Sequence, residues 1–241
     1  MTRPEPTAIG SPLLDTIPRV RHLFLGRAFD SPPGDLEQRE TILDRAGRIG
    51  RPGEAVFFQQ VHGRRVEIYP EAGTGGIVSG TVADGGATDR NGLVLAIRVA
   101  DCLPVYLADR EGKAVALLHA GWRGLAAGIL GAGVRALAGL GVPPDRLLAW
   151  IGPSVGPCCY EVGPEVAAAF GVHGHTRPGR PGKPFLDLYA TALALFQEAG
   201  VGPERVGPRP PCTACDPGRF HSHRAAPERR GRNLALLFLD P

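Results

Sequence analysis

The sequence predicts a mixed α/β (α+β) protein in one compact unit, and three observations lead to this prediction. Short apolar segments with the composition of strands are interspersed with segments of helical periodicity along most of the chain. No internal repeat or long linker divides the 241 residues, so we expect one domain over residues 1–241 rather than two packed lobes. The composition, 43% hydrophobic and 21% charged, is that of an ordinary globular protein.

The predicted elements follow in order along the chain. Strands are expected at apolar segments bounded by turn residues, namely 22–26, 54–61, 93–99, 103–107, 113–118, 147–151 and 234–239. Helices are expected where the spacing or composition favours them, namely 35–48, 122–140, 162–170 and 187–199. The Gly/Pro/basic segment 173–184 is expected to be a loop. The turn-rich residues 1–18 are expected to form an N-terminal arm, either mobile or draped over the fold.

Charge and cysteine content limit the possible partners and the compartment. A formal net charge of +3 is too small to indicate a nucleic-acid partner, and the basic patch at Arg230 and Arg232 is expected to be solvated surface. No apolar run approaches the roughly 18 residues of a membrane span, and the N-terminus has no signal-peptide pattern. The odd count of five cysteines favours a reducing compartment. We therefore expect a cytoplasmic monomer or homodimer.

Three segments place a reactive side chain beside glycine or proline near the end of a predicted strand: QQVHG (59–63), VADCLP (99–104) and LLHAGWRG (117–124). Catalytic groups are often carried where strands pass into loops. The segments contribute His62, Cys102 and His119, a ligand set suited to a borderline-soft ion such as Zn²⁺. Separations of 40 and 17 residues match no zinc finger, so the fold has to bring them together. Three protein ligands would leave one position open, as in catalytic zinc sites.

The same residues also allow a purely structural interpretation. A histidine after a strand commonly satisfies a hydrogen bond, and a lone buried cysteine commonly packs as a small hydrophobic side chain. As metal ligands, two neutral histidines and one thiolate would leave a divalent centre with about one net positive charge, which attracts phosphate. Arg123 would extend that field, and a helix beginning beside it would add N–H donors for an anion.

Five stretches in this order resemble the laccase-domain family: QVHG, ADCLP, HAGWRG, IGPSVGPCCYEV and CTACDPGRFHSHR. Members of that family are known as multicopper polyphenol oxidoreductases and as purine nucleoside phosphorylases. The resemblance runs from about Val56 to the C-terminus. It implies His62, Cys102 and His119 as the ligands of one ion, in a layered α/β sandwich with mixed sheets and flanking helices. The implied activities are zinc-dependent phosphorolysis of adenosine, inosine and methylthioadenosine, and deamination of adenosine, so the partners are a purine nucleoside and phosphate.

The resemblance also implies a substrate pocket. Its expected substrate-binding residues are Gln60, Cys159, Tyr160, Glu161, Ser222 and Arg224. Two departures from the family pattern bear on substrate preference, because ADGGATD (83–89) replaces a more apolar segment and His223 stands where tyrosine is frequent.

A second cysteine-rich stretch allows two interpretations. Cys212-x2-Cys215 followed by His221 and His223 is a pattern of structural zinc sites, although the two histidines are closer together than usual. The resemblance instead assigns this stretch to a loop of the substrate pocket, with the Cys158–Cys159 pair as pocket lining.

Asp101 is expected to act in acid–base chemistry beside the metal. Glycosidic cleavage and deamination both need a proton donor near the purine, and Glu161 is the alternative acid. If 99–104 is a regular strand, however, Asp101 faces away from Cys102 and merely caps the strand or pairs, for example with Arg98. Pro104 argues against a regular central strand and leaves room for a turn.

Other functions remain open at this stage. Copper-dependent polyphenol oxidation is one, because Cu²⁺ outcompetes Zn²⁺ at many N/S sites. A multicopper oxidase needs more histidines than the seven present, and the only methionine is Met1, so an axial methionine ligand is not at hand. A cysteine hydrolase with Cys102 as nucleophile and His119 as base is another. A binding protein with a vestigial metal site is the third, and it would turn over no nucleoside.

Overall fold

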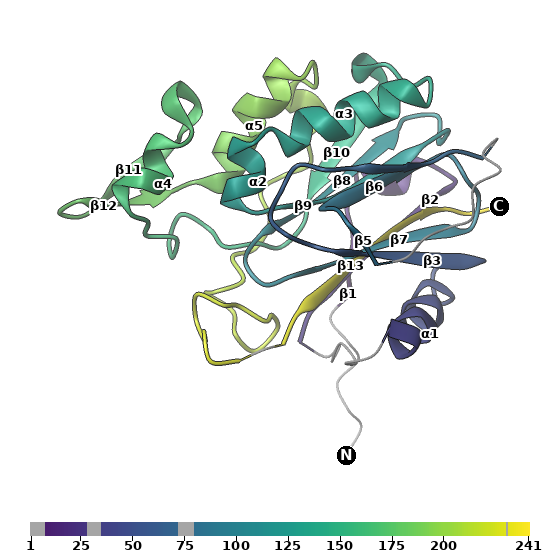
Figure 1. Ribbon diagram of the computed structural model, residues 1–241, viewed down its shortest axis with the longest axis horizontal. Coiled ribbons are helices and arrows are strands. Elements are labelled where there is room, and N and C mark those ends of the chain that lie inside the picture. Colours follow the sequence, from purple (N-terminus) through teal and green to yellow (C-terminus); the bar gives the residue numbers. More distant parts are fainter. Residues whose placement is uncertain (1–7, 28–34, 72–79, 230) are drawn as a thin grey trace.

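The computed structural model describes residues 8–27, 35–71, 80–229 and 231–241, and it consists of four layers (Figure 1). A six-stranded and a five-stranded sheet stack face to face. Helix α1 (Asp35–Ala46) covers the outer face of the first sheet. Helices α2 (Trp122–Ala126), α3 (Ile129–Gly139) and α5 (Leu188–Glu198) cover the outer face of the second. The predicted layered α/β architecture with mixed sheets and flanking helices is confirmed. In the ranges given above, no helix is long and apolar enough to cross a membrane.

The six-stranded sheet has the order β1-β2-β13-β7-β3-β5. Its strands are β1 (Ala8–Ile9), β2 (Val20–Leu25), β13 (Asn233–Leu239), β7 (Leu93–Val99), β3 (Glu54–Gln59) and β5 (Thr81–Val82). The first four pair antiparallel, and β3 and β5 add in parallel beside β7. The C-terminal strand β13 therefore lies at the centre, with the Asn233 end paired to the Val99 end of β7.

The five-stranded sheet has the order β10-β8-β9-β6-β4. Its strands are β10 (Leu147–Ile151), β8 (Leu103–Asp109), β9 (Val115–Ala120), β6 (Gly85–Thr88) and β4 (Glu67–Tyr69). All neighbours pair antiparallel except β6 and β4. The short β4, β5 and β6 were not among the predicted strands, since two to four residues are too few to show an alternation of apolar and polar positions, and two of the four residues of β6 are glycine.

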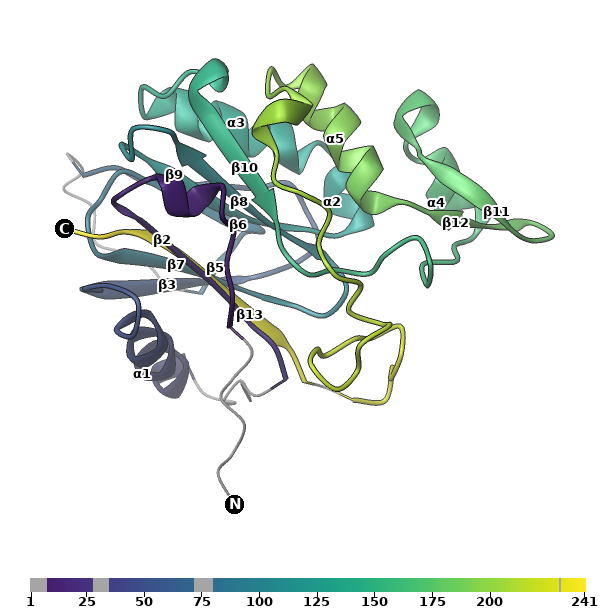
Figure 2. The same ribbon diagram turned by 180° about the vertical axis from the view of Figure 1, so that it is seen from behind.

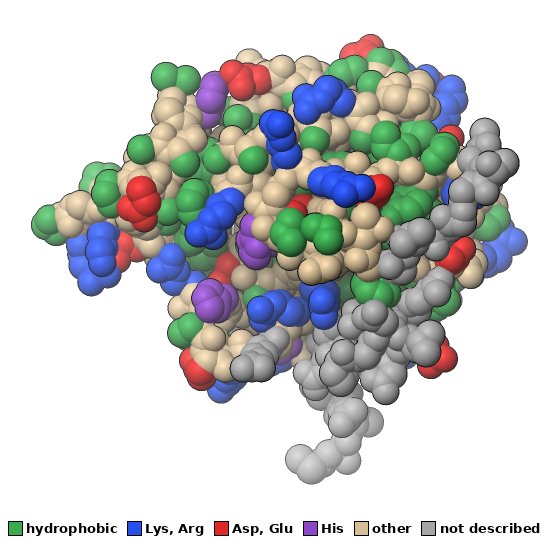
Figure 3. Space-filling view, in the orientation of Figure 1, with side chains coloured by type: hydrophobic (Ala, Val, Ile, Leu, Met, Phe, Trp, Pro, Cys, Tyr) green, Lys and Arg blue, Asp and Glu red, His purple; other side chains and the backbone are tan. Residues whose placement is uncertain are grey.

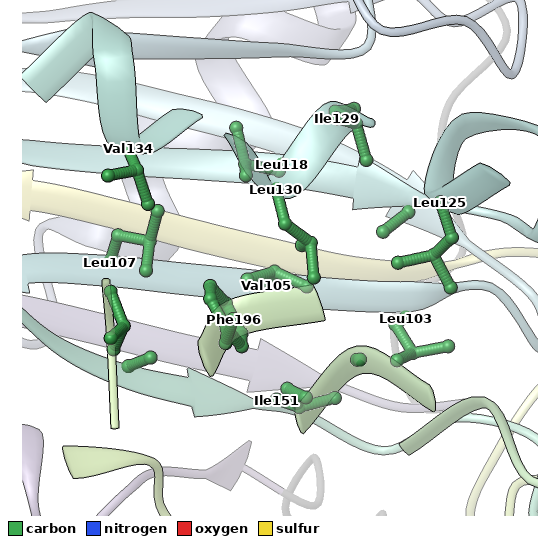
Figure 4. Close-up of a cluster of buried hydrophobic side chains, with 14 of the residues drawn as sticks. Leu103, Val105, Leu107, Leu118, Leu125, Ile129, Leu130, Val134, Ile151 and Phe196 are labelled. Carbon is green, nitrogen blue, oxygen red and sulfur yellow. The ribbon is translucent and has the colours of Figure 1, made fainter. Parts of the chain in front are cut away.

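Alternate residues of the central strands face different layers. Val105 and Leu107 of β8 pack against the helices, and Tyr106 between them packs against the six-stranded sheet. Figure 4 shows the helix side of the five-stranded sheet, where Phe196 of α5 packs near the β8 side chains. Both faces of the five-stranded sheet are therefore buried, which explains why β8 and β9 are apolar at nearly every position.

The helices are α1 (Asp35–Ala46), α2 (Trp122–Ala126), α3 (Ile129–Gly139), α4 (Pro164–Ala168) and α5 (Leu188–Glu198). The single helix predicted over 122–140 is in fact two, because Gly128 adopts a left-handed conformation with φ of 89° between α2 and α3. The best predicted helix is α5, which begins after Asp187, whose side chain accepts the N–H of Ala190 at 3.0 Å.

The predicted loop 173–184 forms most of a hairpin instead, with strands β11 (Thr176–Arg180) and β12 (Lys183–Leu186). Gly182 supplies the left-handed turn with φ of 72°. Backbone hydrogen bonds join β12 to the preceding segment, from Val162 N to Pro184 O and from Leu186 N to Tyr160 O. The hairpin is exposed and rich in glycine, proline and arginine, so its composition concealed the strands.

At the N-terminus, residues 1–7 of the expected arm lie outside the described residues. Between residues 8 and 18, Leu14 and Ile17 are buried in the core between the sheets. The arm therefore packs on the fold from β1 onward. Figure 2, seen from behind, shows the loop that leads into β13 beside the strand ends that carry the motif residues.

Candidate metal centre

His62, Cys102 and His119 come together at one end of the two sheets. His62 follows β3, Cys102 lies between β7 and β8, and His119 belongs to β9. Their candidate ligand atoms all lie within 4.8 Å of one another, and the two imidazole rings have centroids 4.7 Å apart. His119 is buried, Cys102 is half-buried and His62 is exposed, so the centre opens towards solvent on the His62 side.

Unusual backbone conformations position two of the motifs. In the described part of the chain, His62 (φ 59°) and Asp101 (φ 89°) are the non-glycine residues with positive φ. Such conformations cost free energy and persist where surrounding contacts enforce them, frequently at functional sites. The turn at Asp101 is held by a hydrogen bond from Val155 N to its carbonyl oxygen at 3.0 Å. It separates β7 from β8, so Asp101 and Cys102 both face the same cleft rather than opposite faces of one strand.

A buried carboxylate, that of Asp84, positions two of the three candidate ligands, His62 and His119. Its oxygens accept the backbone N–H groups of His62 at 2.8 Å, Gly63 at 2.6 Å and Val61 at 3.3 Å. One of them also lies 2.8 Å from Nδ1 of His119, which leaves Nε2 as the ring nitrogen available to an ion. Asp84 had no assigned role in the sequence-based predictions. Its one sequence signal is an acidic residue between alanine and two glycines in ADGGATD, a stretch of which residues 83–88 are buried.

The electrostatics of the centre favour a thiolate. Burial raises the pKa of the Cys102 thiol, but hydrogen bonds with His119 and His62 outweigh it and lower the pKa to about 7. Burial likewise opposes charge on His119, yet its contacts with Asp84 and Cys102 raise the imidazole pKa to about 9. Burial raises the pKa of Asp84, and its hydrogen bonds with His119 and with the N–H groups of Gly63 and His62 lower it below the ordinary value.

The glycines of HAGWRG allow the close approach of the three segments. A Cβ atom on Gly121 would lie 2.9 Å from Cδ2 of His62 and 3.0 Å from Sγ of Cys102. A Cβ atom on Gly124 would lie 2.7 Å from the carbonyl oxygen of Gly63, so α2 packs directly on the loop that carries His62. Neither position has room for a larger side chain.

This donor set fits one soft divalent ion. Two imidazoles and a readily ionised thiol converge, and a carboxylate orients one of the histidines in the way that is common for histidine ligands. His62, Cys102 and His119 would be the residues that hold the ion, with the exposed side of the centre facing the cleft.

The centre lies in a cleft with a volume of about 1160 Å³. Four arginines are among its described lining residues: Arg98, Arg123, Arg224 and Arg232. Asp101 is the only acidic residue of the described lining. The space-filling view shows arginine and histidine side chains, in blue and purple, gathered on the face that carries this hollow (Figure 3). The cleft is therefore electropositive and suited to an anion. Arg232 of the predicted basic patch belongs to this lining, and Arg230 lies outside the described residues.

The structure brings some of the expected substrate-binding residues to the cleft and not others. Gln60, Tyr160 and Arg224 line it together with Asp101 and Arg123. The remaining three, Cys159, Glu161 and Ser222, are not among the lining residues. Trp122, Arg98 and Gln59 line the cleft although the sequence did not single them out for it.

Asp101 is a connecting residue as well as a cleft residue. One carboxylate oxygen accepts the Thr213 hydroxyl at 2.6 Å, and the other accepts the backbone N–H of Arg224 at 2.6 Å. These partners, rather than Arg98, engage the Asp101 side chain. The carboxylate therefore ties the C-terminal loop to the strand ends that carry Cys102.

The three expected residues outside the lining have other contacts. Glu161 pairs with Arg180 of the hairpin, which lowers the pKa of the Glu161 carboxyl to about 2. Ser222 is buried, and its hydroxyl oxygen accepts the N–H of Ala225 at 3.1 Å. Cys159 lies in a separate group of four cysteines.

Residues 21–240 match the family described as multi-copper polyphenol oxidoreductase laccase. The chain belongs to this family. The resemblance predicted from the motifs is thereby confirmed. The family is a metal-binding enzyme family, in agreement with the cluster at His62, Cys102 and His119.

Curated relatives of this family member carry the name purine nucleoside phosphorylase. One from Xylella fastidiosa is 40% identical over 220 residues, covering 88% of this chain and 81% of its own length. Purine nucleoside phosphorylase YfiH of Escherichia coli is 34% identical over 235 residues, covering 93% and 89%. Among solved structures, YlmD of Geobacillus stearothermophilus has a TM-score of 0.82 at 25% identity, covering all of this chain and 98% of YlmD. These relatives support a role like that of a purine nucleoside phosphorylase.

The donor set of this laccase-family chain differs from that of a multicopper oxidase. Among the residues that the structure describes, histidines gather for a metal only at His62 and His119. His22 accepts the N–H of Ser11, and His173 pairs with Glu198, so both are engaged elsewhere. A trinuclear copper cluster needs more imidazoles than this centre offers.

Proposed function

We propose that the chain is a zinc-dependent purine nucleoside phosphorylase that accepts adenosine, inosine and methylthioadenosine and that also deaminates adenosine. The observation that carries the proposal is the continuity of the cleft, which joins the His62–Cys102–His119 centre to several arginines. The names of the relatives support the same reaction class.

The arginines of the cleft suit the phosphate co-substrate. In phosphorolysis a phosphate oxygen forms a bond to C1′ of the ribose while the bond from C1′ to the purine nitrogen breaks, and the purine leaves with the electron pair. Arg123 would hold the phosphate, because its guanidinium lies in the cleft, 4.5 Å from the centroid of the Trp122 ring. A planar guanidinium binds phosphate through two parallel hydrogen bonds.

Other side chains are suited to fixing the nucleoside. Burial raises the pKa of Tyr160 to about 12, so its hydroxyl remains a hydrogen-bond donor at neutral pH. The Arg224 guanidinium lies 5.1 Å from the centroid of the Tyr160 ring. Gln60 exchanges hydrogen bonds of 2.8 and 2.9 Å with the backbone of Arg98, so it positions the segment before His62.

Asp101 would be the proton donor. The departing purine carries negative charge unless a ring nitrogen is protonated, and Asp101 is the acid among the described lining residues. Its carboxyl would give a proton in phosphorolysis and pass one in deamination. A divalent ion, when bound, would supply Lewis-acid charge and a water of lowered pKa.

The test combines metal content with turnover. Purified protein is analysed for metals and then assayed with adenosine and phosphate for adenine and ribose 1-phosphate, and with adenosine alone for inosine and ammonia. We expect both activities in the zinc-loaded protein, loss of both after chelation, and recovery on addition of Zn²⁺. Zinc-loaded protein that turns over no nucleoside would contradict the proposal.

A second function is favoured by one observation. Asp84, His119 and Cys102 contact one another in this order, with a carboxylate on one imidazole nitrogen and a thiol of lowered pKa beside the ring. This is the arrangement of a cysteine nucleophile with its base. A metal centre also gives His62 a function, as a ligand, whereas the hydrolase arrangement leaves His62 without one. A hydrolase would keep its activity in chelator and lose it on alkylation of Cys102.

A further inference from the structure

Four cysteines from two distant segments meet outside the cleft. Cys158 and Cys159 follow β10, and Cys212 and Cys215 lie in the loop before β13. All four sulfur atoms lie within 4.8 Å of one another, with Cys215 Sγ 3.3 Å from Cys158 Sγ and 3.4 Å from Cys159 Sγ. We propose that this four-cysteine cluster binds a second Zn²⁺ ion, a structural ion that clamps two walls of the cleft together.

The backbone builds the four-cysteine cluster from both sides. The carbonyl oxygen of Gly156 accepts the N–H groups of Cys159 at 3.0 Å and Tyr160 at 3.1 Å, and this tight turn sets two adjacent cysteines on one side. A parallel bridge pairs Ser154 with Cys212, supported by a hydrogen bond from Thr213 N to Ser154 O at 3.0 Å. The pairing delivers Cys212 next to the turn.

The surroundings of Cys212 are those of a metal-bound thiolate. Its sulfur accepts the N–H of Gly156 at 3.1 Å. The backbone N–H groups of Ala214 and Cys215 also contact this sulfur. N–H groups two and three residues after a cysteine point at its sulfur when a CxxC segment wraps around an ion. A Cβ atom on Gly156 would lie 3.2 Å from both Sγ of Cys158 and Cβ of Cys212, so the turn packs closely against the two cysteines.

Geometry and charge both suit zinc. A tetrahedral Zn²⁺ with bonds of about 2.3 Å holds its four sulfurs about 3.8 Å apart, and the cluster needs only small adjustments to reach this. Zn²⁺ would displace one proton from each thiol, and four thiolates around it leave a net charge of −2. Arg177 donates to the carbonyl oxygen of Pro157, the residue before Cys158, at 2.5 Å. This cation lies where it would offset part of that charge.

Disulfide pairing explains the cluster less well. Cys215 contacts Cys158 and Cys159 at nearly equal distances, so no pair is singled out. The histidines that the sequence suggested as partners of Cys212 and Cys215 belong to neither metal-capable group among the described residues. His223 lines the cleft instead.

The cluster connects to the proposed catalytic cleft through Thr213. This residue follows Cys212, and its hydroxyl donates to Asp101 at 2.6 Å. In the other cysteine-bearing segment, Val155 precedes the pair Cys158–Cys159 and Tyr160 follows it, and both Val155 and Tyr160 line the cleft. Loss of the ion would therefore loosen the cleft wall without removing a ligand of the His62–Cys102–His119 centre.

The test counts zinc in protein purified under nitrogen from zinc-supplemented cells. We expect two zinc ions per chain in the unmodified protein, one in Cys215→Ser and one in Cys102→Ala. Cys102→Ala serves as the matched control because it removes a ligand of the other centre. After exchange for Co²⁺, the ion kept by Cys102→Ala should show the strong visible bands and sulfur-to-metal charge transfer of tetrahedral thiolate coordination. Cys215→Ser should lack that intense spectrum.

Accessibility supplies an independent readout. Cys158 and Cys215 are exposed, so their thiols should react quickly with iodoacetamide in chelated protein and slowly in zinc-loaded protein. If Cys215→Ser does not fold, Cys158→Ser, at an exposed position, takes its place. A single zinc per chain that is lost in Cys102→Ala and kept in Cys215→Ser, or disulfides among the four cysteines in protein kept under nitrogen, would each overturn the proposal. Iron in place of zinc at the cluster would overturn the identity of the ion.

Discussion

One oxygen of Asp84 lies 2.8 Å from Nδ1 of His119 and 2.8 Å from the backbone nitrogen of His62. A single buried carboxylate thus fixes the orientation of one candidate metal ligand and the backbone of another. Since Asp84 itself precedes β6, next to β9, the two histidines are held to the same sheet although 57 residues separate them. The third candidate ligand, Cys102, enters from the turn between β7 and β8.

Asp84→Asn should weaken metal binding while the ligands remain. The amide group presents an N–H₂ donor where the carboxylate accepts the N–H groups of His62 or Gly63. We expect the zinc affinity to fall roughly 10–100-fold, the usual effect of losing such a supporting group. Competition with a chromophoric chelator measures it, with Asp44→Asn, at an exposed position in α1 outside the cleft lining, as control. An unchanged dissociation constant for zinc would show that Asp84 serves the fold alone.

Gly121→Ala should disturb the centre by its size alone. The backbone at Gly121 has φ of −72° and ψ of 168°, which alanine adopts without strain. The added methyl group would meet His62 and Cys102 at about 3 Å and push the two ligands apart. We expect less than one bound ion per centre after dialysis, by elemental analysis. Gly139→Ala in α3 is the control, because its Cβ would lie 4.0 Å from its nearest neighbour, Cδ1 of Ile68. Equal metal content in the two variants would contradict the steric argument.

Arg123→Lys should weaken phosphate use. The substitution keeps the charge and loses the planar group that binds two phosphate oxygens at once. We expect the KM for phosphate to rise at least about tenfold, a loss on the scale of one charge-assisted hydrogen bond. Arg64→Lys, an exposed position outside the cleft lining, controls for the loss of a guanidinium. The same phosphate dependence in both variants would remove Arg123 from this role.

The sequence predicted the longer strands of both sheets because they have enough residues to show an apolar pattern. β7 and β10 begin and end at the predicted residues. It could not predict β6, whose glycines are required by packing, since a Cβ on Gly85 would lie 2.6 Å from the carbonyl oxygen of Leu117. Strands specified by close approach rather than by side-chain pattern leave little trace in composition.

The residues of the site likewise include some that the sequence could predict and some that it could not. His62, Cys102 and His119 stand in motifs that combine a reactive side chain with a strand end, so they could be predicted. Asp84 could not, because its role depends on three backbone N–H groups and on the pairing of β6 with β9. The meeting of Cys158 and Cys159 with Cys212 and Cys215 likewise depends on a tertiary bridge that no local spacing encodes.

His22 should make stability depend on pH. Burial lowers its pKa below 6.5, against the opposing charge of Asp15, and Nε2 accepts the N–H of Ser11 at 2.7 Å. Because the folded state resists protonation more than the unfolded state, the stability is complete above the unfolded pKa and declines as pH falls below about 6.5. Urea unfolding at pH 7.5 and 5.5 should show a smaller difference for His22→Gln than for the unmodified protein. An identical difference would contradict this role.

Asp101→Asn should separate proton transfer from positioning. The substitution keeps the size of the side chain and removes the acid, so phosphorolysis and deamination should both fall about a hundredfold, the usual scale for a general acid or base. Bound zinc should stay stoichiometric.

Asp101 also holds Thr213 and the backbone of Arg224, so a purely structural role predicts a loss of activity too. Thr213→Val distinguishes the two, since it removes one of these contacts and leaves the carboxyl group in the cleft. A proton-transfer role predicts near-normal kcat in Thr213→Val and a changed pH profile of kcat in Asp101→Asn. Equal losses of kcat in both variants, with unchanged pH profiles, would show that Asp101 is a positioning residue. Another group would then have to be the proton donor.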